Sequence, residues 1–265
     1  MVKLSEIANG REGSSVTIRP VHARLSDDMR YYRTLRQLVS NIYKFTVDNI
    51  VSEYLSEQAK GQLLDADIKD VSRSTFDQLK AAAGIWALTS ERGVDNILNQ
   101  AGDRHTMAFN AAVKSAVGVD TSAILNKEGI AGIVRAQSQF SASLITNLSD
   151  DFISKIESTV YQAALQGTSV KDLTAQLAKL RGVTDRRAKL IATDQMQKFN
   201  GNLNKARQEE LGITEYEWIT VGDSKVRDDH ASRSGKTFRW DEPPEDGHPG
   251  QAVRCRCTAG AIVSF

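Results

Sequence analysis

The run Gly222-Asp223-Ser224-Lys225-Val226-Arg227-Asp228-Asp229-His230 opens a C-terminal segment that ends at Phe265 and also contains Cys255-Arg256-Cys257. Both cysteines of the chain and two of its four histidines fall in this segment. The residues before it mostly repeat apolar positions every three or four residues, as amphipathic helices do, and carry few chemically reactive groups. The search for a functional site therefore centres on the C-terminal segment.

Three stretches of this segment predict short strands. Residues 215–220 and 237–240 are rich in aromatic and β-branched residues, and residues 254–263 supply a third strand. Because a lone hairpin is marginally stable, we expect a small sheet of two or three strands packed on the preceding helix. The expected fold class is α+β, predominantly α-helical with a small C-terminal β-sheet.

Apolar spacing and capping residues divide the rest of the chain into helices. One helix is predicted from Ser26 to about Gly61, and a second helical region follows up to the turn at Gly118. Four shorter helices are then expected, near 129–147, at 150–166 with Ser149 as N-cap and Gly167 as stop, from Thr168 to Gly182, and from Thr184 to Leu211-Gly212. We divide the chain into an N-terminal arm (1–25), a helical region (26–118) and a second domain (119–265), with helices over 119–212 and a β-rich tip at 213–265.

Composition limits the classes of function. The 265 residues are 40% hydrophobic and 25% charged, with a formal net charge of +1, so the chain has no global field that would draw it to nucleic acid or a membrane. No signal peptide and no apolar run of membrane-spanning length is present, and we expect a soluble protein without a membrane partner. A bridge between cysteines separated by one residue would constrain little, which leaves reduced thiols or metal ligands.

The cysteines and histidines of the tip match the donor types of a zinc site. His230, His248, Cys255 and Cys257 supply four ligands, the number that closes a tetrahedral structural site and leaves no open position. The Cys-x-Cys spacing is less usual than Cys-x2-Cys. A metal-free interpretation, in which the histidines hold turns and the cysteines pack in a small core, stays open beside it. If a metal is bound, we expect structural Zn²⁺.

Two further interpretations involve other residues. Asp223, Asp228 and Asp229 beside His230 suggest a hydrolytic metal centre of a nuclease or peptidase, although aspartates also cap turns and helix starts. No Ser/His/Asp order, Walker loop or glycine fingerprint is found, and we expect no enzyme. The basic side chains of Arg186, Arg187, Lys189 and Lys198 are candidates for contact with nucleic acid or a partner protein, or for an ordinary solvated helix face.

The ordered positions of residues 120–262 resemble the phage Mu F-like minor head protein family, also described as a phage head morphogenesis domain. The resemblance is carried by Ala192-Thr193-Asp194-Gln195, Asn200, Arg207, Gly212, Tyr216-Glu217-Trp218, Asp223, Val226-Arg227, His230, Gly235, Phe238, Pro243-Pro244, His248-Pro249-Gly250 and Cys255-Arg256-Cys257. Many relatives have Cys-x2-Cys where this chain has Arg227-Asp228-Asp229-His230, which places His230 at the second cysteine. The family's usual Thr-Glu is Thr193-Asp194 here.

The resemblance implies a virion protein without enzymatic activity, namely a minor capsid component that acts in phage head morphogenesis and prohead assembly. The implied partners are the portal protein, the major capsid or scaffold protein and phage DNA. The implied location is the phage head of a tailed bacteriophage, assembled in the host cytoplasm. A metal-dependent hydrolase and a DNA-binding module are the alternative functions.

Overall fold

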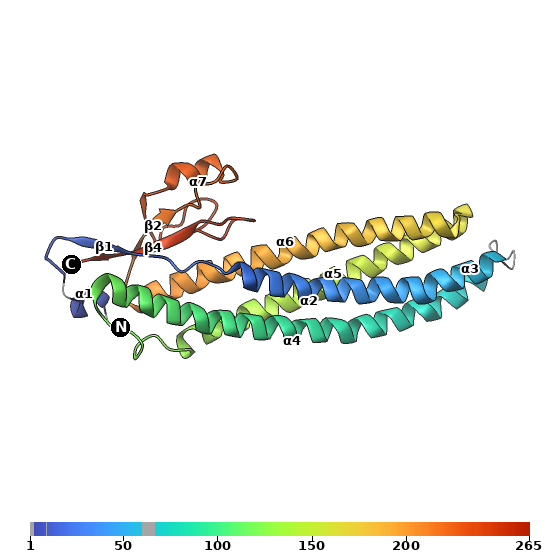
Figure 1. The fold of residues 1–265 in the computed structure, drawn as a ribbon, viewed down its shortest axis with the longest axis horizontal. Coiled ribbons are helices and arrows are strands. Elements are labelled where there is room, and N and C mark those ends of the chain that lie inside the picture. Colours follow the sequence, from blue (N-terminus) through green and yellow to red (C-terminus); the bar gives the residue numbers. More distant parts are fainter. Residues whose placement is uncertain (1–2, 9, 60–66) are drawn as a thin grey trace. The chain divides into compact units, whose positions relative to one another are not determined.

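The computed structural model describes residues 3–8, 10–59 and 67–265, and the chain is mostly helical with a four-stranded antiparallel sheet (Figure 1). In chain order the elements are α1 (Leu4–Ile7), β1 (Ser15–Ile18), α2 (Leu25–Phe45), the π-helix η1 (Thr46–Val51), α3 (Ser52–Ala59), α4 (Asp67–Val117), α5 (Glu128–Gln166), α6 (Val170–Glu210), β2 (Glu215–Ile219), α7 (Asp228–Arg233), β3 (Thr237–Arg239) and β4 (Thr258–Ser264). The predicted fold class is confirmed. No described helix is long and apolar enough to cross a bilayer.

The helices are longer than the capping residues predict. Helix α5 runs through Ser149, the expected N-cap, and α6 runs through Gly182 and Thr184. Thr184 Oγ1 donates to the carbonyl oxygen of Leu180 at 3.1 Å, so the hydroxyl is satisfied inside the helix and starts no new one. The stops at Gly167 and Gly212 are confirmed, since both glycines adopt left-handed φ values of +62° and +69°. The predicted end of the first helix, Gly61, lies outside the described residues.

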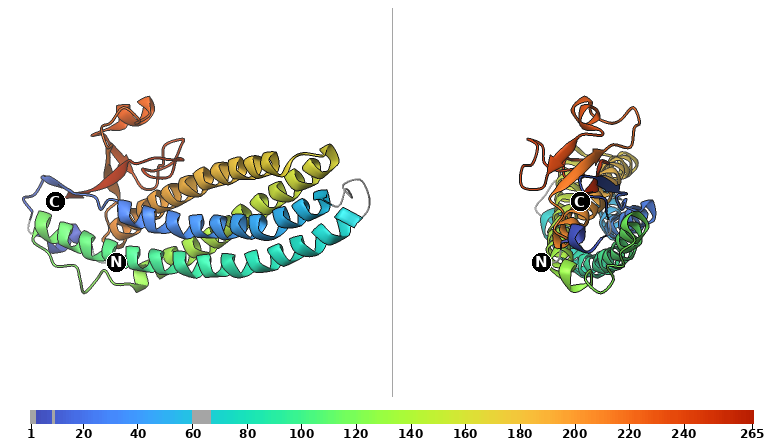
Figure 2. Two further views of the ribbon diagram at one scale, coloured as in Figure 1. Left: turned by 45° about the vertical axis from the view of Figure 1, so that its right-hand side comes forward. Right: turned by 90° about the vertical axis from the view of Figure 1, so that its left-hand side faces the viewer.

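Residues 30–95 and 139–192 form one compact unit. Its helical segments lie side by side, as both ribbon views show (Figures 1 and 2). The hydroxyl of Tyr54 donates to the carbonyl oxygen of Ala163 at 3.1 Å, and Lys80 pairs with Glu157 at 3.1 Å. Apolar residues fill the space between these helices, which buries the stripes that the sequence spacing predicts.

The second compact unit comprises residues 1–29, 96–138 and 193–265, and it contains the sheet. The strand order is β1-β4-β2-β3, and every neighbouring pair is antiparallel. Strands β2, β3 and β4 occupy the predicted stretches. Strand β1 is the addition: it comes from residues expected to form an arm or linker, and Ser15–Ile18 pairs with β4 along its length. Four residues are too few to show a periodic pattern, which explains why the sequence does not mark this strand.

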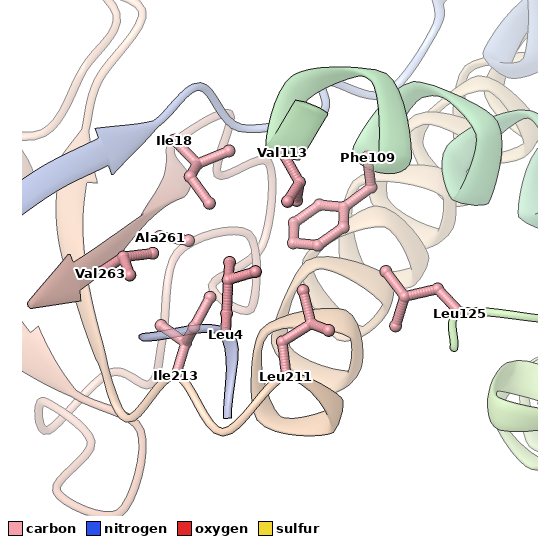
Figure 3. Packing of buried hydrophobic residues seen from close by; sticks show 9 residues of the cluster. All are labelled: Leu4, Ile18, Phe109, Val113, Leu125, Leu211, Ile213, Ala261 and Val263. Atoms are coloured by element: carbon pink, nitrogen blue, oxygen red, sulfur yellow. The ribbon is translucent and has the colours of Figure 1, made fainter. Parts of the chain in front are cut away.

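The N-terminal residues complete the apolar core of this unit (Figure 3). Leu4 and Ile18 pack with residues of α4, of the loop before α5, of the turn between α6 and β2, and of β4: Phe109, Val113, Leu125, Leu211, Ile213, Ala261 and Val263. The backbone nitrogen of Leu4 also donates to the carbonyl oxygen of Leu211 at 2.9 Å. Burial of leucine and isoleucine side chains contributes about 1.5–3 kcal/mol each. The segment before α2 is therefore an integral part of the sheet and its core.

A second core contains the two cysteines. It consists of Tyr216, Trp218, Trp240, Cys255, Cys257 and Ala259. The Tyr216 and Trp240 ring centroids are 4.2 Å apart, and Tyr216 also stacks on Phe238 at 5.9 Å. The rings of His230 and His248 pack against this aromatic cluster, through Trp218 and Trp240 respectively.

Candidate metal centre

His230, Cys255 and Cys257 converge although 25 residues separate the first two in sequence. His230 lies on the short helix α7, and the cysteines precede β4. The Nδ1 atom of His230 is 3.5 Å from the Sγ atom of each cysteine, and the three potential ligand atoms lie within 4.8 Å of one another. All three residues are buried, with exposed fractions of 2%, 2% and 4%. This group could hold a metal ion.

The spacing of these donors suits a tetrahedral zinc ion. Bond lengths of about 2.3 Å to sulfur and about 2.0–2.1 Å to nitrogen, with a tetrahedral angle, place the nitrogen about 3.6 Å from each sulfur. The observed separations of 3.5 Å agree with that value. Two soft sulfurs and an imidazole are donors that favour zinc over hard cations such as magnesium or calcium.

A carboxylate orients the imidazole toward the sulfurs. The Nε2 atom of His230 lies 2.6 Å from Asp246 Oδ2, and Arg233 Nη1 donates to Asp246 Oδ1 at 2.5 Å. Burial opposes ionisation of Asp246, but these two hydrogen bonds keep its pKa below the ordinary value. Because an ionised carboxylate only accepts hydrogen bonds, Nε2 donates to Asp246, and Nδ1 is the ring nitrogen on the side of the sulfurs that can ligate a metal. Carboxylate–histidine pairs of this kind support metal sites.

A hydrogen bond between the two thiols shifts their pKa values in opposite directions. The hydrogen bond from Cys257 lowers the pKa of Cys255, and the Gly250 amide donates to Cys255 Sγ at 3.4 Å. The same hydrogen bond, together with burial, raises the pKa of Cys257. Cys255 is therefore disposed to be the thiolate of the pair, and the thiolate is the form that ligates a metal.

Helix α6 holds the loop that carries the cysteines. Among the described residues Arg254 is the non-glycine residue with a positive φ, +59°, and its backbone nitrogen donates to Asp194 Oδ1 at 2.9 Å. A Cβ atom added to Gly201 would lie 2.8 Å from the carbonyl oxygen of Pro249, so loop and helix backbones are in close contact. Gln251 Nε2 also donates to Asn202 Oδ1 at 2.8 Å. Asp194 is thus a supporting residue whose role the sequence did not indicate.

The fourth predicted ligand, His248, lies outside the group. Its Nδ1 atom is 3.0 Å from the hydroxyl oxygen of Tyr216, and its ring packs edge-on against Trp240 with centroids 4.8 Å apart. Gly247 and Gly250, both at φ +89°, turn the chain so that the imidazole rests on the aromatic cluster. Burial lowers the pKa of His248, and nearby Lys205 adds to the effect.

The aspartates of the hydrolase hypothesis are exposed and separate from the metal-binding group. Asp223 accepts two hydrogen bonds from Arg256, at 2.6 and 2.7 Å, which lower its pKa to about 2. Asp228 and Asp229 occupy the first turn of α7, where carboxylates favour the positive end of the helix. Within the described residues the potential metal ligands that gather are His230, Cys255 and Cys257. The arrangement lends no support to a carboxylate-based hydrolytic centre.

The basic residues of α6 differ in their surroundings. Arg187 pairs with Asp151 at 2.6 Å, and Lys198 pairs with Asp194 at 2.8 Å. Arg186 and Lys189 are exposed on α6. The ion pairs of Arg187 and Lys198 leave less free positive charge than the residue types suggest.

Comparison with known proteins agrees with the resemblance seen in the sequence. Residues 154–260 match the family described as Phage Mu protein F like protein. The chain carries a phage Mu F-like domain. This Mu F-like domain includes His230, Cys255 and Cys257 and also the supporting residues Asp194 and Asp246.

One curated relative aligns along nearly the whole chain. It is an uncharacterized protein of Haemophilus influenzae (strain ATCC 51907 / DSM 11121 / KW20 / Rd), 31% identical over 269 residues, which cover 97% of this chain and 58% of that protein. The chain therefore spans less than two thirds of the relative's length. No solved structure matches this chain significantly.

Proposed function

We propose that this protein is a minor head component of a tailed bacteriophage that acts in prohead assembly next to the portal. The observation that carries the proposal is the Mu F-like domain at residues 154–260. In this proposal the portal protein and the major capsid or scaffold protein are its partners, and the mature protein resides in the phage head.

The metal centre supports a structural role within that function. His230, Cys255 and Cys257 would hold a zinc ion that ties α7 to the loop before β4, and bound zinc contributes to folding because the ligands converge only in the folded state. The tip otherwise depends on one small aromatic core and short strands. A metal ion that links α7 to the loop before β4 therefore gives this part of the Mu F-like domain a defined surface for assembly contacts.

The charges of α6 restrict how this protein could contact phage DNA. Arg187 and Lys198 are engaged with aspartates, and the net charge of +1 supplies no long-range attraction to a polyanion. Any DNA contact would rely on Arg186 and Lys189, and it would show a steep salt dependence because counterions are released at each phosphate.

Co-expression with the portal, scaffold and major capsid proteins tests the proposed function. We expect the wild-type protein to sediment with assembled proheads and to be enriched in particles that contain portal. A Cys255→Ser, Cys257→Ser double variant is tested in parallel, because it removes the two sulfur ligands of the proposed zinc site and leaves the helices unchanged. If the wild-type protein stays in the soluble fraction while portal-containing proheads form, the proposal is wrong.

A further inference from the structure

A small cavity opens beside the metal-binding group. Its volume is about 10 Å³, close to the space that one water molecule needs. It is lined by Val221, Lys225, Val226, Arg227, His230, Arg254, Cys255, Arg256 and Cys257. This lining includes all three residues of the metal-binding group and no aspartate or glutamate. The cavity therefore adjoins the donors without supplying a fourth protein ligand.

The walls of this cavity are positively charged. The charge of Arg256 is balanced by Asp223. Arg227 Nη2 donates to the carbonyl oxygen of Val253 at 2.7 Å, which fixes its position at the cavity. Within the described residues neither Arg227 nor Arg254 forms an ion pair. Arginine presents donors in a planar fork that matches the two oxygens of a carboxylate.

We propose that the metal's fourth position faces this cavity and takes an oxygen of a carboxylate supplied by an aspartate or glutamate of a partner protein. The inference rests on the proposed metal centre. Zinc bound to two thiolates and a neutral imidazole carries no net charge, so the attraction for an anion comes from the basic residues that line the cavity, namely Lys225, Arg227 and Arg254. In the absence of the partner, one water molecule fills the position, as the size of the cavity allows.

The surroundings favour a protein side chain over a free small acid. Val221 and Val253 are 43% and 54% exposed and lie next to the basic walls. An apolar rim beside a charged recess fits a folded surface that brings apolar and acidic groups together, whereas acetate uses only the recess. His248 is occupied by Tyr216 and Trp240 and does not compete for the position.

Cobalt substitution tests the inference in the full-length chain. The metal-free protein is loaded with Co²⁺, whose d–d absorption reports the coordination number and the ligands, and is titrated with acetate, with inorganic phosphate and with a capped Val-Glu-Val peptide. We expect a four-coordinate thiolate spectrum, a saturable change with acetate, tighter binding of the peptide and weaker binding of phosphate. Arg227→Gln and Arg254→Gln should each weaken acetate binding about fivefold or more, without changing Co²⁺ affinity. Arg239→Gln, whose arginine pairs with Asp241 outside the cavity, is the matched control and should have no effect.

Each other result overturns a defined part of the inference. Absence of a thiolate–cobalt band removes the metal centre itself, whereas a normal band that acetate leaves unchanged removes only the carboxylate ligand. A cobalt spectrum that changes in His248→Ala without added acetate shows that His248 is the fourth ligand. Tighter binding of phosphate than of acetate contradicts the carboxylate, and tighter binding of acetate than of the peptide contradicts a partner side chain.

Discussion

The carboxylate of Asp194 on α6 accepts a hydrogen bond of 2.9 Å from the backbone nitrogen of Arg254, the residue directly before Cys255. Arg254 is held at φ +59°, a conformation that costs a non-glycine residue about 1 kcal/mol. The hydrogen bond to a buried, charged acceptor offsets that cost. Helix α6 thus fixes the backbone from which Cys255 and Cys257 project.

Two substitutions of Asp194 distinguish the effect of its hydrogen bond to the Arg254 amide from the effect of its negative charge. In Asp194→Ala the Arg254 amide loses its acceptor, so we expect a loss of about 1–3 kcal/mol in the free energy of unfolding and weaker zinc binding. Asp194→Asn keeps an acceptor oxygen and should lose much less, although its ion pair with Lys198 is removed. Chemical denaturation and competition with a zinc-binding dye measure the two effects. Equal losses in both variants would show that the charge, not the contact with Arg254, matters.

Close contact between α6 and the loop leads to a second prediction. In Gly201→Ala the new methyl group would lie 2.8 Å from the carbonyl oxygen of Pro249, so the loop must shift, and we expect destabilisation of about 1–3 kcal/mol. Gly132→Ala is the matched control, because Gly132 is exposed on α5 with no atom within 4 Å of the added methyl group. That control should gain about 0.5–1 kcal/mol from helix propensity alone. Thermal denaturation of both variants measures the difference, and stabilisation of Gly201→Ala would contradict the close packing.

Much of the fold follows from local pattern, whereas the lengths of the helices do not. Strands β2, β3 and β4 appear where aromatic and β-branched residues cluster, and glycines end α5 and α6 as predicted. Ser149 and Thr184 have the chemistry of N-caps, but both are buried within continuous helices. A cap residue marks a helix start only where the chain turns. The packing of neighbouring apolar residues decides whether the chain turns or the helix continues.

The candidate site was predictable in its donors and less so in their arrangement. His230, Cys255 and Cys257 are recognisable from residue type, and the structure brings them together. The position of His248 depends on a turn at Gly247 and Gly250 and on the contact of its ring with Trp240. Only the three-dimensional arrangement defines both. Asp194 and Asp246 lack any local sequence signal, because one acts through a backbone amide and the other through the far nitrogen of an imidazole.

The contact between His230 and Asp246 predicts a measurable effect on metal affinity. Asp246→Asn replaces an ionised acceptor by an amide, so the imidazole becomes a weaker and less oriented ligand, and we expect a loss of about 10- to 100-fold in zinc affinity. Asp241→Asn, at an exposed carboxylate paired with Arg239, is the control and should leave affinity unchanged. Elemental analysis after dialysis against graded chelator concentrations gives both values. Unchanged zinc retention in Asp246→Asn would exclude the carboxylate as a support of the site.

Chelation should destabilise the tip if the metal is structural. Removal of zinc leaves three buried donors without their common ligand, so we expect a lower melting temperature for the metal-free wild-type protein than for the zinc-loaded one. The Cys255→Ser, Cys257→Ser variant is the control, since its melting temperature should not respond to chelator. Scanning calorimetry with and without added Zn²⁺ makes the comparison. A wild-type melting temperature that is insensitive to zinc would argue against a structural ion.

A buried histidine in the same compact unit predicts a pH dependence of stability. His105 is 3% exposed, its Nε2 atom lies 3.2 Å from Asn204 Oδ1, and its Nδ1 atom has no hydrogen-bond partner among the described residues. Burial lowers the pKa of His105 from 6.5 to about 4, and the nearby charge of Arg207 acts in the same direction. Between these two values the unfolded chain binds a proton that the folded protein excludes. The contribution to stability is therefore fully present above pH 6.5 and is lost as the pH falls toward 4.

Replacement of His105 by glutamine removes this titration and keeps a group that can donate to Asn204. We expect the stability of the wild-type protein relative to His105→Gln to fall by about 2–3 kcal/mol between pH 7 and pH 4. His22→Gln, at an exposed histidine of the same unit, serves as the control and should follow the wild-type curve. Urea denaturation at a series of pH values gives the three curves. A difference between wild type and His105→Gln that stays constant with pH would show that His105 is not held neutral by burial.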